Sequence, residues 1–368
     1  MLKNILTITP FFSPNIGGVE THLTDLTSKL SILGYQNYVL TYSPISTTDV
    51  TWQHSEKINK NLHIRRFSWF GNNLFHRLEK KPLLNLIYIT PYLLIRSIIW
   101  LIIHHPKIDV IHSHGLNAAI IGIFLQKIFH INRHIVSIYS SYDNVPKSNL
   151  YISTILNRVD VVLTQSQRSI DQLTKLGVDK NKTHRYRHWI DTAKFKPLNT
   201  TRKRPSVLFI GRMIPQKNAL LLAKVAKTFP NIDFNFVGEG PDYSKIKKLS
   251  QVNKNIILHG NVSYEKLAGY YQNSDLFCLP SKYDEGWGRV LMESIACGVP
   301  VLATDMGAVP EVVDKTVSVL FTPNLTNLKK HLTNIQSIIT LKKNCRSYAL
   351  KHFSDKNISL ITRFYVKT

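Results

Sequence analysis

The chain has 368 residues, of which 43% are hydrophobic and 10% aromatic. This composition excludes a disordered or fibrous protein, and the length exceeds what one ordinary core supports, so we expect two domains. The net charge of +24 would attract nucleic acid, an anionic lipid surface or a phosphorylated small molecule. No run of five or six basic residues concentrates this charge, which argues against a nucleic-acid tail, and a solvated basic surface without a specific partner stays an alternative.

The cysteines and the N-terminus point to a reduced compartment. Cys278, Cys297 and Cys345 are odd in number and widely spaced, so they predict neither a disulfide framework nor a zinc ligand set. The segment MLKNILTITPFF has a short apolar run, but no signal-peptide cleavage site follows it. We therefore expect a cytosolic protein whose first buried strand lies here.

Short β-branched runs alternate with amphipathic segments along most of the chain. The runs that predict strands in the first half are NILTIT, QNYVLTY, LHIRRF, DVIHSH, HIVSIY and VDVVLTQS. Those in the second half are SVLFIG, DFNFVG, NIILHG, LFCLP, VPVLAT and SVLFT. Helical periodicity occurs at 19–33, 218–229, 264–273 and 288–297. This alternation predicts two doubly wound domains with parallel sheets, joined by the polar linker 196–205.

One segment, 83–103, approaches the length of a membrane span. It contains Pro91 and a central Arg96, and an arginine at mid-bilayer costs about 2.5–3.5 kcal/mol on insertion scales, which argues against spanning. Two interpretations stay open: a buried or domain-packing helix, or an interfacial helix lying on a membrane. The flanking basic residues that would contact anionic headgroups are Arg77, Lys80, Lys81 and Lys107.

Ligands of open parallel sheets bind beyond the carboxyl ends of the strands, so the loops there are the candidate site. Gly17 and Gly18 follow the first strand and open a helix, where backbone amides can approach an anion. In GRMIPQKN, Arg212 and Lys217 suit a diphosphate, with planar and point-charge contacts respectively. A tight turn and a pair of solvated basic residues are the plainer explanations. In VGEGPD, Glu239 is best explained as part of a simple turn.

The stretch YDEGWGRVLMESIACGVPV places Glu285 and Glu293 around two glycines. Each glycine costs about 1 kcal/mol inside a helix, so we expect a loop that holds Glu285 and a helix that starts near Gly288. The backbone amides of Gly288, Arg289 and Val290 would then meet an anion at the positive end of the helix dipole. Carboxylates on both sides suit the hydroxyls of a sugar and of a ribose.

These loops resemble a known family. EGWGRVLMESIACGVPVLATDMGAVPEVV resembles the E-x7-E segment of retaining nucleotide-sugar glycosyltransferases of GT-B fold, in their family 4-like branch. The resemblance implies an α/β protein with two Rossmann-like domains that face each other across a cleft. It predicts an acceptor-binding domain at 1–197 and a nucleotide-sugar-binding domain at 203–350. The remaining residues, 351–368, would form a C-terminal helix packing back on the first domain.

The resemblance also implies roles for the candidate residues. Arg212, Lys217 and Glu285 would be catalytic: the two cations stabilise the departing diphosphate, and Glu285 contacts the donor sugar. The residues expected to bind the nucleotide-sugar are Gly17, Gly18, Val262, Tyr264, Gly288, Arg289, Val290 and Glu293. Glu293 would hold the ribose, and Val262 with Tyr264 would line the base pocket. The donor would be the substrate, with no cofactor and no metal, and no Asp-x-Asp pair is present in the sequence to hold one.

Two departures from the family pattern matter. Tyr139 stands where the family commonly has a histidine, and HWID at 188–191 replaces its usual Asn-Gly-Val-Asp. His112 and His114 belong to the preceding strand end and fit a structural role better. The apolar, basic N-terminal half leads us to expect a glycan or lipid-linked acceptor and a cytoplasmic enzyme peripheral to the inner face of the membrane. The alternatives are a non-catalytic protein that binds nucleotide-sugar, a GT-B epimerase and, least favoured, a nucleic-acid-binding protein.

Overall fold

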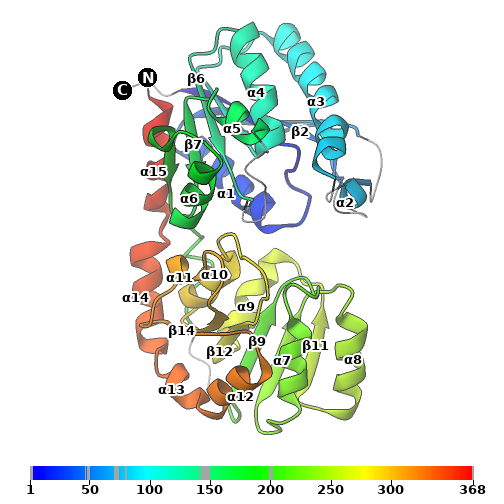
Figure 1. The fold of residues 1–368 in the computed structure, drawn as a ribbon, viewed down its shortest axis with the longest axis vertical. Coiled ribbons are helices and arrows are strands. Elements are labelled where there is room, and N and C mark those ends of the chain that lie inside the picture. Colours follow the sequence, from blue (N-terminus) through cyan, green and yellow to red (C-terminus); the bar gives the residue numbers. More distant parts are fainter. Residues whose placement is uncertain are drawn as a thin grey trace. The chain divides into compact units, whose positions relative to one another are not determined.

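The chain forms two compact units in a computed structural model (Figure 1). The residues that the structure describes are 3–45, 47, 50–69, 74–78, 81–140, 142, 150–198 and 202–366, without the side chains of 75, 76, 82 and 83. Unit 1 comprises Met1–His188 with Ile358–Thr368, and unit 2 comprises Trp189–Asn357. The predicted membrane contact Lys80 lies outside the described residues.

Unit 1 is built on an eight-stranded sheet of order β3-β4-β2-β1-β5-β6-β7-β8. Its strands are β1 Asn4–Ile8, β2 Gln36–Tyr42, β3 Ser55–Asn59, β4 Leu62–Phe67, β5 Val110–His114, β6 Arg133–Ser137, β7 Val161–Thr164 and β8 Thr183–Arg185. The six predicted strands are confirmed. The edge strands β3 and β8 were missed, because SEKIN is polar and mostly exposed and THR is only three residues long. β3 pairs antiparallel with β4, so the sheet is not wholly parallel as expected.

Helices cover both faces of this sheet. They are α1 Gly18–Ile32, α2 Leu74–Leu78, α3 Pro82–His104, α4 Leu116–Ile128, α5 Tyr151–Leu156, α6 Gln167–Lys175 and α15 Ser359–Thr362. Neighbouring residues of a strand point to opposite faces. Leu40 accordingly packs with α3 and α4, while Val39 packs with Leu23 of α1.

Helix α3 is the apolar segment that the sequence left open between two interpretations. By length and composition it could cross a membrane: an 18-residue window within Leu84–His104 has a mean hydropathy of 2.0, and 33% of that window is buried. One face, with Ile89 and Leu93, packs into the core of unit 1. The other face exposes a stripe of apolar side chains: Leu84, Ile87, Ile95, Ile99, Ile102 and Ile103. The packing interpretation therefore accounts for one face and leaves the other uncovered among the described residues.

Unit 2 contains a six-stranded parallel sheet of order β11-β10-β9-β12-β13-β14. Its strands are β9 Ser206–Ile210, β10 Asp233–Val237, β11 Ile256–Gly260, β12 Leu276–Leu279, β13 Val301–Thr304 and β14 Ser318–Phe321. Its helices are α7 Ala219–Ala226, α8 Tyr243–Val252, α9 Leu267–Gln272, α10 Arg289–Ala296, α11 Val309–Val312, α12 Leu325–Thr333, α13 Ile335–Ile339 and α14 Lys342–His352. Every strand predicted in this half is confirmed. Alternate residues of β9 enter two cores: Phe209 packs with α7 and Leu208 with α10.

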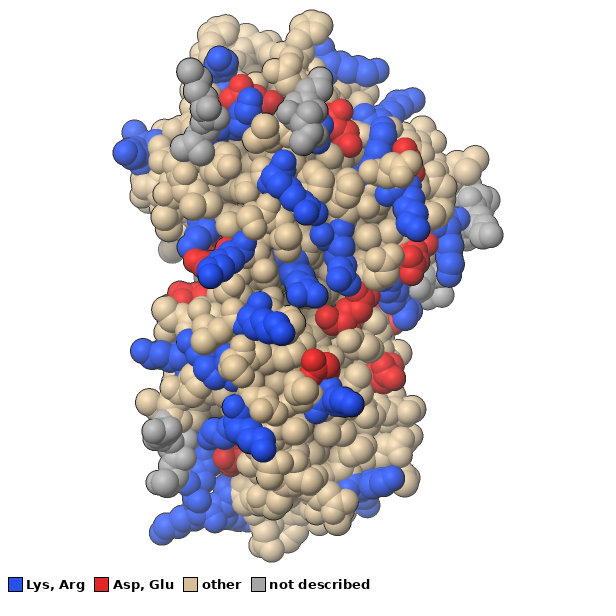
Figure 2. Space-filling model, turned by 90° about the vertical axis from the view of Figure 1, so that its left-hand side faces the viewer, with Lys and Arg blue, Asp and Glu red and all other residues tan. Residues whose placement is uncertain are grey.

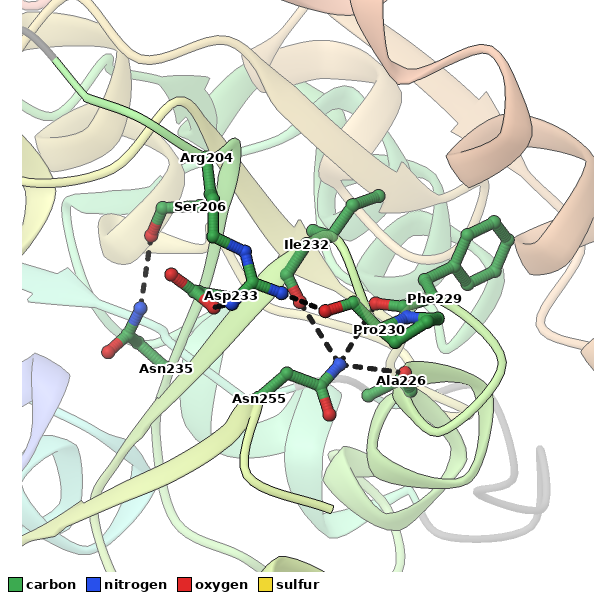
Figure 3. Close-up of polar contacts among 9 residues, drawn as sticks. All are labelled: Arg204, Ser206, Ala226, Phe229, Pro230, Ile232, Asp233, Asn235 and Asn255. Atoms are coloured by element: carbon green, nitrogen blue, oxygen red, sulfur yellow. Dashed lines mark hydrogen bonds and ion pairs between the residues drawn. The ribbon is translucent and has the colours of Figure 1, made fainter.

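Side chains also fix the turns at the amino ends of the unit 2 strands (Figure 3). The amide nitrogen of Asn255 donates to the carbonyls of Ala226, Phe229 and Ile232 at 2.9–3.0 Å, which holds the turn between α7 and β10. Arg204 pairs with Asp233 at 3.6 Å and donates to the carbonyl of Pro230. These contacts brace the edge of the sheet opposite the carboxyl ends of the strands.

The two units meet along the chain at different positions from those predicted. The proposed linker, 196–205, begins after residues that already belong to unit 2, because Ile190 and Phe195 are buried in its core. Arg346 donates to the carbonyl of Phe195 at 2.8 Å and anchors this segment. The first unit thus ends at His188 rather than at residue 197.

The C-terminal segment 351–368 is not one helix as predicted. Helix α14 ends at His352 within unit 2, and short turns of helix follow from Asp355 to Tyr365. The last part, from Ile358, belongs to unit 1, where the Tyr365 hydroxyl lies 2.9 Å from Nδ1 of His112. The chain therefore crosses between the units twice.

The basic side chains are spread over the surface as the sequence indicates. On the face drawn in Figure 2, Lys and Arg side chains are scattered over both units and outnumber the acidic ones. A scattered field of this kind attracts anions in general and does not by itself select a partner.

Candidate active site

The loops at the carboxyl ends of the unit 2 strands are tied together by backbone contacts. Met213 N donates to Glu239 O, and Gly238 N donates to Gly260 O, both at 2.7 Å. A Cβ on Gly238 would lie 2.2 Å from the carbonyl oxygen of Gly211, so only glycine permits this approach. The loops after β9, β10 and β11 thereby form one continuous edge, the place where ligands bind in such sheets.

Lys217 and Glu285 form an ion pair at this edge. The ammonium nitrogen of Lys217 lies 2.7 Å and 2.6 Å from the two carboxylate oxygens of Glu285, and the Ser281 hydroxyl also donates to that carboxylate. The side chain of Glu285 is only 4% exposed, against 18% for Lys217. The buried carboxylate thus orients an ammonium group that still reaches solvent.

Two further hydrogen bonds hold the loops that carry Lys217 and Glu285 together. Asn218 adopts the left-handed conformation, with φ 57°, and its side-chain amide donates to the carbonyl of Pro280 at 3.0 Å. Lys282 N donates to Gln216 O at 2.7 Å. These bonds fasten the turn before α7 to the loop after β12, so Lys217 faces Glu285.

Gly307 supports Glu285 from the loop after β13. It has a φ of +60°, and a Cβ there would lie 2.6 Å from both the backbone nitrogen and the carbonyl oxygen of Glu285. The next amide, that of Ala308, donates to this carbonyl at 3.0 Å. Gly307 was not singled out from the sequence, and only the close approach of the two loops shows its importance.

Glu293 anchors a second polar cluster at the start of α10. Arg289 Nε donates to Oε1 and the Tyr271 hydroxyl donates to Oε2, both at 3.0 Å. Arg289 Nη2 donates to the Tyr264 hydroxyl at 2.6 Å. Burial and the adjacent Glu293 charge together hold the pKa of Tyr271 well above its usual value, so its hydroxyl stays protonated and donates.

The helix that carries this cluster starts where the sequence predicted. Gly288, with φ +66°, precedes the first helical residue, and Leu291 N donates to Gly288 O at 2.8 Å. A Cβ on Gly288 would lie 2.8 Å from Cδ1 of Leu291. The glycine thus allows the chain to turn sharply from the loop that holds Glu285 into α10.

The other candidate residues of unit 2 lie outside these two clusters. Arg212 is exposed immediately after β9, and Val262 and Val290 are half-buried against the core. Lys194, which the sequence did not single out, places its ammonium 3.6 Å from the centre of the Tyr264 ring, a cation–π contact. The structure thus brings Tyr264, Arg289 and Glu293 together. The side chain of Arg212 contacts neither cluster among the described residues.

The candidates of unit 1 lie at the start of α1. Gly17 precedes the helix and Gly18 is its first residue. A Cβ on Gly17 would lie 2.1 Å from a carboxylate oxygen of Glu20, whereas one on Gly18 would meet nothing within 4 Å. Gly17 therefore makes room for an acidic side chain over the helix start, which the sequence did not predict.

Tyr139 and the neighbouring histidines form a buried network in unit 1. The Tyr139 hydroxyl lies 2.8 Å from Nδ1 of His114, and His112 Nε2 lies 2.9 Å from the Ser137 hydroxyl. Burial lowers the pKa of His112 and of His134 to about 3 and that of His114 well below its usual value. These imidazoles are neutral and hydrogen-bonded, which supports the structural role favoured for His112 and His114.

Two further features concern metal binding and the position of a cavity in unit 2. Within the described part of the chain, no group of three or more His, Cys, Asp or Glu side chains is arranged to hold a metal ion. A cavity of about 610 Å³ opens beside Ser206 and Asp233, at the amino ends of β9 and β10. It lies at the edge opposite the two clusters and is therefore not the candidate active site.

Comparison with known proteins identifies the family. Residues 16–194 match Glycosyltransferase Family 4, and residues 191–352 match Glycosyl transferases group 1. The phosphatidylinositol N-acetylglucosaminyltransferase GPI3 subunit of Saccharomyces cerevisiae is 24% identical over 86% of this chain and 71% of its own. The uncharacterized glycosyltransferase MJ1178 of Methanocaldococcus jannaschii is 25% identical over 96% and 95% of the respective chains.

Solved structures agree on the fold. Sucrose-phosphate synthase from Thermosynechococcus elongatus superposes with a TM-score of 0.78 at 19% identity, covering 98% of this chain and 97% of that one. HepE from Anabaena in complex with UDP-glucose superposes at 0.73 with 17% identity and 98% coverage of both chains. With two Rossmann-like units, two matching family domains and these relatives, the chain belongs to the GT-B glycosyltransferases of the family 4 type and is an enzyme of that class.

Proposed function

We propose that the enzyme transfers a sugar from a nucleoside-diphosphate sugar to a hydroxyl group of a lipid-linked or glycan acceptor, with retention at the anomeric carbon. The observation that carries this proposal is the pairing of Lys217 with buried Glu285 beside the Arg289–Glu293 cluster. The structures of HepE with UDP and with UDP-glucose favour a uridine nucleotide as donor.

The cations would act on the diphosphate. Lys217, held by Glu285, and the exposed Arg212 would stabilise the negative charge that develops as the sugar leaves. Fixed donors are effective here because they need no reorganisation during the reaction. Removing one such donor typically costs about a hundredfold or more in rate.

The two carboxylates would bind rather than transfer protons. Glu285 already accepts hydrogen bonds from Lys217 and Ser281, which orient its carboxylate so that it can accept a further hydrogen bond from a sugar hydroxyl. Glu293, fixed by Arg289 and Tyr271, would accept from the ribose hydroxyls. The departing phosphate would then take the proton of the attacking hydroxyl, and no metal would be required.

The acceptor would be a lipid at a membrane surface. Relatives from yeast, Arabidopsis thaliana and human are named for transfer to phosphatidylinositol, which supports a lipid acceptor. The exposed apolar stripe of α3 suits attachment to a bilayer without crossing it. We therefore propose a cytoplasmic enzyme that works at the inner face of the membrane.

The test is an assay of transfer with the full-length protein. The protein is incubated with radiolabelled UDP-N-acetylglucosamine or UDP-glucose and a membrane lipid extract, and UDP and organic-phase label are measured. We expect UDP and labelled lipid in equal amounts, with the anomeric configuration of the donor kept in the product by NMR. UDP release without a labelled product, or a product of inverted configuration, would contradict the proposal.

Tyr139 occupies the position of the family's usual histidine, and its hydroxyl is engaged by His114 within the buried network of unit 1. Saturable UDP binding with no UDP release from any donor would contradict the proposed transfer.

A further inference from the structure

A second cavity, of about 350 Å³, opens in unit 1 at the end of β4. Arginines line it from two elements: Arg65 and Arg66 from β4, and Arg96 from α3. Because β4 runs parallel to β2, and β2 to β1, the end of β4 lies at the carboxyl edge of the sheet. The cavity therefore lies at the edge where open parallel sheets bind ligands.

Of these arginines, Arg66 is fully engaged by the protein. It pairs with Glu56 at 2.9 Å and donates to the carbonyls of Ser13 and Gln53. Its role is structural, since it fastens the loop after β1 to the edge strand.

Arg65 and Arg96 differ from Arg66. Among the described residues neither forms an ion pair or a side-chain hydrogen bond, and the Nε atom of each is buried without a partner. Their guanidinium carbons lie 5.9 Å and 5.2 Å from the centre of the Phe67 ring, so both cations gather around one aromatic side chain. A buried donor without a partner, and positive charge that no acidic side chain of the cavity lining compensates, are each unfavourable.

An anion in the cavity would remove both costs at once. A guanidinium group presents several N–H donors in a plane and matches the oxygens of a phosphate, often through two bonds. Phe67, and Tyr92 at 5.9 Å from Arg96, hold the guanidinium of Arg96 in position through cation–π contacts. The geometry is that of a preformed site for a phosphate group.

The position of the site indicates where the phosphate comes from. Arg96 is preceded by Ile95, which is 55% exposed, and Ile99 follows on the same exposed stripe of α3. Successive helical residues are about 100° apart, so Arg96 lies at the flank of the apolar stripe. A cationic cavity beside exposed apolar side chains complements an anionic headgroup attached to acyl or prenyl chains.

We propose that Arg65 and Arg96 bind the phosphate group of a membrane lipid whose chains lie along the exposed stripe of α3. This inference deepens the proposed function, because it rests on a lipid acceptor, and it assigns a site in unit 1 for the lipid's phosphate. Free phosphate offers the same chemistry, and the experiment separates the two sources.

The test uses the full-length protein and three probes. They are vesicles of phosphatidylcholine with phosphatidic acid, vesicles of phosphatidylcholine alone, and inorganic phosphate. Binding to vesicles is measured by flotation, and binding of inorganic phosphate by the shift in melting temperature. The test variant is R65Q/R96Q, and R65K/R96K keeps the charges if the first variant folds poorly. The matched control K127Q/R158Q removes two exposed cations elsewhere on unit 1.

We expect the wild type to bind the vesicles that contain phosphatidic acid, and R65Q/R96Q to bind them at least tenfold more weakly. The control K127Q/R158Q should bind within about twofold of the wild type, and R65K/R96K should bind with intermediate strength. An equal loss in the control, or no binding by the wild type, would overturn the site. Stabilisation by inorganic phosphate without vesicle binding would overturn the lipid as its source.

The same variants separate this inference from the proposed function. UDP binding by unit 2 should be the same in R65Q/R96Q and the wild type, because both arginines belong to unit 1. Transfer to lipid with an unchanged KM for the acceptor in R65Q/R96Q would refute the site and leave the function standing. Arginine-dependent vesicle binding without any sugar transfer would refute the function and leave the site standing.

Discussion

The ammonium nitrogen of Lys217 lies within 2.7 Å of both carboxylate oxygens of Glu285, although the two residues are 68 positions apart in the chain. Because the carboxylate is almost fully buried and the ammonium is not, the pair links stability to function. Replacing Lys217 should therefore affect folding as well as sugar transfer.

Lys217→Met should lower sugar transfer by about a hundredfold or more, because the departing diphosphate loses a fixed cation. It should also lower the free energy of unfolding by about 3 kcal/mol, since Glu285 is left as a buried charge without its cation. Urea denaturation and kcat are measured together. In the double variant K217M/E285Q most of the stability should return while transfer stays low, and recovery of transfer would refute the phosphate role.

Glu293→Gln should raise the dissociation constant of UDP about tenfold, because a neutral amide accepts hydrogen bonds from ribose hydroxyls less strongly than a carboxylate. Isothermal titration calorimetry measures the constant. Tyr271→Phe is the control, since it removes a donor from the opposite oxygen of the same carboxylate. We expect this control to change UDP binding less than threefold, and an equal loss in both variants would indicate a structural role for Glu293.

Gly307→Ala should reduce transfer more than tenfold and destabilise unit 2 by about 2 kcal/mol or more, because its Cβ would overlap the backbone of Glu285. Gly177→Ala is the matched control. Gly177 also has a positive φ, +89°, but its Cβ would meet Ser153 at an ordinary 3.6 Å. The control should cost about 1–2 kcal/mol from its backbone conformation alone and leave transfer intact.

Unit 1 should lose stability as the pH falls below about 6.5. Burial lowers the pKa values of His112 and His134 from 6.5 to about 3. Between pH 3 and pH 6.5 the unfolded chain therefore binds more protons than the folded one, and stability rises with pH. Each histidine should cost about 2 kcal/mol between pH 6.5 and 5. Hydrogen exchange of β5 and β6 amides measures this loss of protection.

Replacing one of these histidines gives the control for the pH dependence. His134→Gln keeps a side-chain nitrogen near the Ser113 hydroxyl and removes one titrating group, so the dependence should become shallower. His104→Gln, at an exposed position of α3, should leave the dependence unchanged. Identical slopes in all three proteins would contradict the assignment.

Chelation tests the proposal that no metal takes part. EDTA should leave the rate of UDP release within about twofold of the untreated enzyme, because fixed Lys and Arg side chains stabilise the diphosphate in place of a cation. A loss of activity that added Mg²⁺ or Mn²⁺ restores would contradict this prediction.

Periodicity predicted most of the fold, since strands such as β9 and β12 are buried at every residue and appear in the sequence as short apolar runs. It missed β3, because a polar edge strand has no apolar pattern and exists only through its pairing with β4. The linker was placed too late for a similar reason. Residues 189–195 have no strand or helix pattern in sequence, and only the packing of Ile190 and Phe195 in the core of unit 2 shows that they belong to it.

The sequence by itself determined the family and the residue types of the site, because the spacing of Glu285 and Glu293 and the glycines that start α10 are local features. The tertiary structure decided their partners. It set Lys217 on the Glu285 carboxylate, Gly307 against the Glu285 backbone, and Arg65 and Arg96 around one cavity. The first two contacts join different strand-end loops, and residues distant in the chain acquire a common chemistry only when the parallel strands bring those ends to one edge of the sheet.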